Sequence, residues 1–81
     1  MALFQDSGQS EPDRNAEATT LTRRIKEWMQ ADAANFDKLT PYERIFMTDK
    51  ISRLDKFGSL RFIQPTQLFC LRDIWEKIGQ L

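Results

Sequence analysis

The chain has 81 residues, and its twelve basic and twelve acidic side chains give a formal net charge of zero. Apolar residues make up 41% of it and charged residues 30%, which is typical of one soluble globular domain rather than of a disordered chain. No apolar run approaches the roughly 20 residues that span a bilayer, so we expect no membrane segment and a cytoplasmic location.

Residue types that carry chemistry are scarce in this sequence. It contains no histidine, a single cysteine at Cys70, and three isolated glycines. Histidine-dependent nucleophilic catalysis, a cysteine zinc site and a glycine-rich phosphate loop are therefore excluded. We expect a protein that is not an enzyme and that needs neither a cofactor nor a metal ion.

Residues 1–18 are predicted to form a flexible acidic tail. They have no apolar periodicity and are rich in Ser, Gly, Pro, Asn and acidic residues, so they cannot bury enough surface to offset the entropy of ordering. Such a tail is either a solvated arm or a segment that orders on a partner, with Phe4 as its large apolar anchor. Residues 19–81 then form a single helical domain.

The first helix is predicted to begin near Thr19 or Thr20, either of which can serve as its N-cap. Apolar residues follow at helical spacing on one face: Leu21, Ile25, Trp28, Met29 and Phe36. The helix dipole disfavours cations near a helix N-terminus, yet the first two turns hold Arg23, Arg24 and Lys26. This arrangement is a weak indication of a functional role.

The next two helices carry clear boundary signals. Thr40 and Glu43 match a capping box around Pro41, and Gly58 supplies the left-handed residue that commonly ends a helix. Pro65 suits the first turn of the last helix in the same way. Each of these helices has an apolar face, and the apolar segment between them is expected to pack against the helices.

The predicted fold class is all-α, a small bundle of three helices (about 19–35, 41–57 and 65–78) with a disordered N-terminal tail. Three amphipathic helices with short connections must bury their apolar stripes against one another. Some sixty residues can do this only with a thin margin of stability, which favours a bound partner or a second copy of the chain.

Four apolar residues are candidates for a partner-binding surface: Ile45, Met47, Phe62 and Phe69. Ile45 and Phe69 lie off the main apolar stripes of their helices, and Met47 suits either a core or an interface. One explanation is that a central helix contacts neighbours on two sides. The other is that these residues form an exposed apolar patch for a partner.

An alternative is a nucleic-acid surface made of Arg23, Arg24, Lys26 and Arg44. The last two helices could be mistaken for a helix-turn-helix motif. However, their connection is longer than the three or four residues of that motif, and Asp73 and Glu76 lie on the exposed side of the would-be recognition helix. This reading therefore ranks second.

Residues 39–78 resemble a short helical-hairpin module found in phage- and prophage-encoded accessory proteins. The matching positions are Leu39, Thr40, Glu43, Phe46, Ile51, Leu60, Gln67, Leu71 and Ile74. The sequence departs from the module at Thr66, where a lysine is usual. The resemblance implies an accessory or adaptor role, no catalytic residues and a mobile-element origin.

The sequence thus predicts a small, non-enzymatic helical module for protein–protein interaction, acting as an adaptor, a regulator or a phage-type inhibitor. A protein partner is expected, and a second copy of the chain is one alternative. An accessory nucleic-acid-binding protein is the other.

Overall fold

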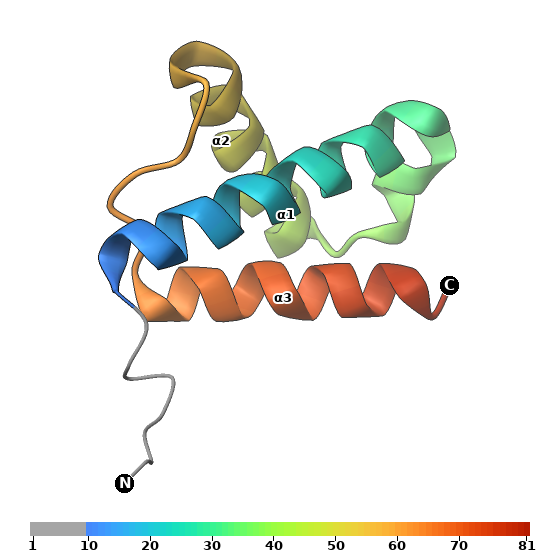
Figure 1. The fold of residues 1–81 in the computed structure, drawn as a ribbon. Coiled ribbons are helices and arrows are strands. Elements are labelled where there is room, and N and C mark those ends of the chain that lie inside the picture. Colours follow the sequence, from blue (N-terminus) through green and yellow to red (C-terminus); the bar gives the residue numbers. More distant parts are fainter. Residues whose placement is uncertain (1–9) are drawn as a thin grey trace, which may run out of the picture.

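A computed structural model of the protein describes residues 10–81 (Figure 1). Its elements are α1 (Glu11–Ala31), the short 3-10 helix η2 (Ala33–Lys38), α2 (Pro41–Phe57) and α3 (Pro65–Gly79). No strand occurs in this part of the chain, which confirms the predicted all-α bundle. Figure 1 shows α1 running alongside α3, with the beginnings of both helices at the same side of the molecule, while α2 crosses behind them.

The first helix begins about two turns earlier than predicted, at Glu11 rather than near Thr19. Ser10 is its N-cap, and the Ser10 hydroxyl accepts a hydrogen bond from the backbone N–H of Asp13 at 3.3 Å. Residues 11–18, which the prediction placed in the flexible tail, are therefore helical. The other predicted tail residues, Phe4 among them, lie outside the described residues.

Polar side chains on the opening turns of α1 hold the loop that precedes α3. Asn15 Oδ1 accepts from the backbone N–H of Ile63 at 3.0 Å, and Thr19 Oγ1 accepts from that of Leu60 at 2.9 Å. Arg14 Nε donates to the Ile63 carbonyl at 3.1 Å. We call these three contacts the α1–loop clamp. They satisfy backbone groups that would otherwise be buried without partners.

The far end of α1 is also set by a polar residue. The helix ends at Ala31 rather than near residue 35, because Asp32 leaves the helical conformation and caps η2, where Asp32 Oδ1 accepts from Ala34 N at 2.9 Å. Asn35 is buried and donates through Nδ2 to the Trp28 carbonyl at 2.8 Å. This side-chain bond replaces the helical hydrogen bond that the Trp28 carbonyl loses at the end of the helix.

The capping box at the start of α2 is confirmed. Thr40 Oγ1 accepts from Glu43 N at 3.1 Å, and Glu43 Oε1 accepts from Thr40 N at 2.8 Å. Gly58 ends the helix with φ of 80°, in the left-handed region. Glu43 also accepts from Lys77 Nζ at 2.8 Å, so one carboxylate both caps α2 and joins it to α3.

The core is formed by one cluster of buried apolar side chains from all three long helices and from the loops. Its members are Ala18, Leu21, Ile25, Leu39, Met47, Leu54, Leu60, Ile63, Leu68, Leu71 and Ile74. Three aromatic residues are only partly buried and pack against this cluster: Trp28, Phe46 and Trp75. The core is therefore largely aliphatic, and aromatic rings form its margin.

The Glu43 carboxylate should make the protein sensitive to acid. Burial alone would raise the pKa of Glu43, but hydrogen bonds from Lys77 and from the Thr40 backbone, with the nearby Lys77 charge, lower it below its usual 4.5. A lowered pKa in the folded state stabilises the protein above pH 4.5, and this stabilisation is lost as the pH falls through the folded-state pKa. In urea titrations at decreasing pH, we expect Glu43→Gln to reduce the acid-induced loss of unfolding free energy.

Candidate interaction surface

Three of the four residues predicted to bind a partner are exposed. Ile45 is 73% exposed, Phe62 76% and Phe69 70%. Met47 is not available to a partner, because it is 0% exposed. Its position explains this, since Met47 shares the inward face of α2 with Lys50 and Leu54, which are also buried.

The three exposed residues do not form one patch. Ile45 lines a hollow beside Phe36, Phe62 lines a cleft beside Phe57, and Phe69 borders a small polar hollow on α3. Each hollow has a different chemistry. The predicted single surface is therefore replaced by separate sites.

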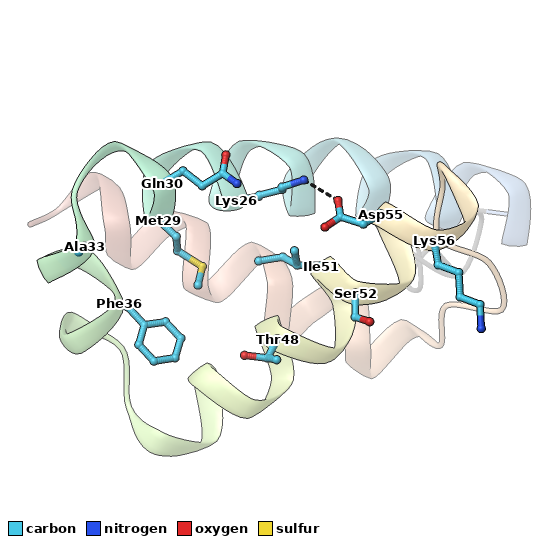
Figure 2. A pocket seen from close by; sticks show the side chains of 10 residues that line it. All are labelled: Lys26, Met29, Gln30, Ala33, Phe36, Thr48, Ile51, Ser52, Asp55 and Lys56. Carbon is cyan, nitrogen blue, oxygen red and sulfur yellow. Dashed lines mark hydrogen bonds and ion pairs between the residues drawn. The ribbon is translucent and has the colours of Figure 1, made fainter.

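A groove lies between α1, η2 and α2 and has a volume of about 800 Å³. Its apolar lining consists mainly of Met29, Phe36 and Ile51, one side chain from each of these elements. Figure 2 shows Met29 and Ile51 pointing toward one another across the groove, with Phe36 beside them. The Lys26–Asp55 ion pair bridges the two long helices at the other end. We call this the α1–α2 groove.

A neighbouring hollow extends the α1–α2 groove along α2. The two share the side chains of Phe36, Thr48 and Ser52, and the extension adds Ile45. Exposed Ile45 thus continues the apolar surface of the groove floor. Sequence periodicity assigns Met29, Phe36 and Ile51 to the buried face of their helices, so it could not reveal that they border an open groove.

Of the four basic residues predicted to bind nucleic acid, Lys26 and Arg44 are bonded to protein groups. Lys26 pairs with Asp55. Arg44 donates to the backbone carbonyls of Phe36 at 3.1 Å and Asp37 at 3.0 Å, and its guanidinium lies 5.4 Å from the Phe36 ring centre. Arg44 therefore holds η2 against the start of α2.

The remaining two basic residues, Arg23 and Arg24, are exposed on α1. Arg23 Nη2 lies 3.4 Å from the Gly58 carbonyl, so Arg23 reaches the C-terminal end of α2. Arg44 lies near the opposite end of this helix, about 20 Å away along its axis. The four predicted residues therefore do not form one continuous basic surface.

A second cleft lies where α2 ends and the loop to α3 begins. Its lining residues are Arg53, Phe57, Ser59, Arg61 and Phe62. Phe57 is 60% exposed and Phe62 76%, so both rings are open to solvent. Phe62 also has φ of 57°, a left-handed backbone conformation that bulky residues rarely adopt. We call this the Phe57–Phe62 cleft.

The left-handed backbone at Phe62 should carry a measurable strain. Glycine adopts this conformation without the steric penalty of a Cβ atom, which is about 1 kcal/mol or more. We expect Phe62→Gly to be more stable to urea than Phe62→Ala by roughly 1 kcal/mol. Equal stabilities of the two variants would show that the backbone at this position is not left-handed in solution.

The single cysteine is a poor candidate for a reactive group. Cys70 is partly buried, and burial, with the nearby negative charges of Glu43 and Asp73, raises the pKa of its thiol. A raised pKa keeps the thiol protonated at neutral pH and lowers its nucleophilicity.

In residues 10–81, no three His, Cys, Asp or Glu side chains are grouped so that they could hold a metal ion.

The fold and these surfaces define a small all-α protein with an open apolar groove and a separate cleft of aromatic and basic residues. Comparisons with protein-family models, with curated proteins and with solved structures gave no match for this chain. Among the described helices, none has the length and apolar character required to cross a bilayer.

Proposed function

We propose that this protein is a non-enzymatic interaction module whose α1–α2 groove binds an amphipathic helix of a partner protein. The observation that supports this most strongly is the groove itself, with apolar Met29, Phe36 and Ile51 lining a solvent-open space of about 800 Å³. Small soluble domains usually cover such side chains, so an open apolar groove favours a binding role.

The shape and lining of the groove suit a helical partner. It lies between two helices, and polar side chains such as Gln30, Thr48 and Ser52 border the apolar residues. An amphipathic helix would place its apolar face on Met29, Phe36 and Ile51 and its polar edges against these borders. Ile45 would extend the contact along α2 by about one further turn.

More specific versions of this proposal are an adaptor, a regulator or a phage-type inhibitor acting in the cytoplasm. The resemblance of residues 39–78 to phage-encoded helical hairpins favours a mobile-element origin. A second copy of the chain is the alternative occupant of the groove, and sedimentation equilibrium would identify it by mass.

Affinity capture with groove-blocking variants tests the proposed function. Thr48→Arg and Ser52→Arg place long charged side chains in the groove from exposed positions on α2 and should not disturb the core. Thr66→Arg, also exposed but on α3, is the matched control. Proteins captured from a lysate of the native cell by the wild type and by Thr66→Arg should be lost with both groove variants.

Cross-linking from a photoreactive residue at position 52 would then place the captured protein against the groove. The proposal is contradicted if every captured protein binds the groove variants as well as the wild type. It is also contradicted if the wild type captures nothing and sediments as a monomer.

A further inference from the structure

The Phe57–Phe62 cleft shares no lining residue with the α1–α2 groove or with its extension. Its lining consists of two phenyl rings, two guanidinium groups and one hydroxyl, without an aliphatic or an acidic side chain. Pockets for the apolar side chains of peptides are usually lined by aliphatic as well as aromatic residues. This cleft instead combines flat aromatic surfaces with cations.

The surroundings of the cleft add positive charge. Lys56 Nζ lies 5.3 Å from the centre of the Phe57 ring, and Arg23 reaches the Gly58 carbonyl beside it. Arg61 has no ion-pair partner among the described residues and is exposed. The cleft therefore offers cations to an anionic ligand.

Two acidic residues of α2, Asp49 and Asp55, are already paired. Asp49 Oδ2 lies 3.0 Å from Arg53 Nε and 3.4 Å from Lys50 Nζ, and Asp55 pairs with Lys26. Their charges are thus largely compensated within the protein. Arg53 shares its charge with Asp49, so Arg61 is the guanidinium of the lining with the most charge available for a ligand.

From this combination we infer that the Phe57–Phe62 cleft binds single-stranded nucleic acid. A base stacks on the exposed rings of Phe57 and Phe62, while Arg61 and Arg53 contact the flanking phosphates. Exposed aromatic rings beside cations are the elements with which proteins hold single strands, because every base has a π-face and every linkage a negative charge. Paired bases are already stacked within a duplex, so the ring contacts require a single strand.

Fluorescence anisotropy with labelled twelve-nucleotide oligodeoxyuridine and oligouridine strands tests this inference. We expect the wild-type protein to bind at low salt and to lose affinity steeply as salt is added. An excess of unlabelled DNA duplex of the same length should compete weakly. The ratio of the two affinities would show whether the 2′-hydroxyl contributes.

Ring variants isolate the stacking contact. Phe62→Gly and Phe57→Ala should each weaken binding at least about fivefold, whereas Phe62→Tyr, which keeps an aromatic ring, should bind nearly as the wild type does. Phe62→Gly is especially informative because it removes the ring and places the residue that best tolerates a left-handed backbone at this position. Phe69→Ala is the matched control, since the exposed fraction of Phe69 lies between those of Phe57 and Phe62 and it is on another surface.

The phosphate contact has its own signature. Arg61→Gln should weaken binding and reduce the slope of log K against log salt by about 0.7, the value for one phosphate contact on a single strand. These measurements do not involve the α1–α2 groove, so a failure to bind single strands would not contradict the proposed function. Loss of the proposed groove function would likewise not contradict nucleic-acid binding by the cleft.

Several results would overturn the inference. They are no salt-dependent binding of either strand, unchanged affinity of Phe62→Gly and Phe57→Ala, and competition by the duplex as effective as that by the unlabelled strand. Competition by an oligoglutamate peptide of equal charge, as effective as that by the strand, would instead assign the cleft to an acidic protein.

Discussion

Replacing Leu71 by alanine is expected to lower the free energy of unfolding by about 2–5 kcal/mol, the range for deleting a fully buried leucine side chain. Leu71 is 0% exposed at the centre of the α3 face that packs into the core. The surrounding side chains relax only partly into the cavity left behind. Urea unfolding followed by far-UV circular dichroism measures this change.

Phe69 provides the internal control for this prediction, because it lies only two residues away on the same helix. Its larger side chain is 70% exposed, so Phe69→Ala should change the free energy of unfolding by no more than about 0.5 kcal/mol. If Phe69→Ala proved as destabilising as Leu71→Ala, α3 would have to turn Phe69 as well as Leu71 toward the core.

Removing residues 1–18 should destabilise the protein severely, by about 3 kcal/mol or more, since it deletes the clamp residues Arg14 and Asn15. It also removes Ala18 from the core and the paired carboxylate of Glu17, which lies 2.6 Å from Arg72 Nε. A chain that begins at Ser10 keeps every one of these contacts and is the matched control. Thermal unfolding of the two shortened proteins distinguishes a helix from a dispensable tail in this region.

Point variants measure how much of this loss of unfolding free energy comes from the α1–loop clamp. Asn15→Ala and Thr19→Val should each lower the free energy of unfolding by about 1–3 kcal/mol, because each leaves a backbone N–H of the loop without its acceptor. Equal stability of the chains beginning at residues 10 and 19 would mean that the opening turns of α1 do not pack on the loop.

The second half of the fold follows from local sequence signals. The boundaries of α2 are set by capping and backbone conformation at four residues: Thr40, Pro41, Glu43 and Gly58. These effects involve only residues that are close together in the sequence. The predicted range of α3 agrees with the structure for a similar reason, with proline at its first position. Helix boundaries can be predicted from the sequence where capping residues mark both ends of the helix.

The start of α1 could not be found from apolar periodicity. Its opening turns use Asn15 and Thr19 to hold the loop, and a polar face looks like a solvated tail in a sequence. A cap signal was present, since Ser10 is followed three residues later by Asp13, with Pro12 between them. The partners of these residues lie more than 40 positions further along the chain, beyond the reach of any local pattern.

The surfaces were predictable only in part. Ile45 and Phe69 lie off the apolar stripes of their helices, and the structure exposes both. Met47 could not be excluded in advance, because its burial depends on how α2 is rotated against α1 and α3. Whether the α1–α2 groove is open depends on the distance between the two helices, and the exposure of the Phe62 ring depends on the φ angle of Phe62. Neither quantity follows from the pattern of apolar residues in the sequence.

The α1–loop clamp also constrains when the protein can fold during its synthesis. Thr19 accepts a hydrogen bond from Leu60, which follows it by 41 positions, and Asn15 accepts one from Ile63, which follows it by 48. The opening turns of α1 therefore leave the ribosomal exit tunnel before the loop that donates these hydrogen bonds. Translation must pass residue 63 by the length of the tunnel before those bonds can form. The first helix therefore lacks its loop partners until residue 63 has emerged, and its native packing cannot be completed before that point.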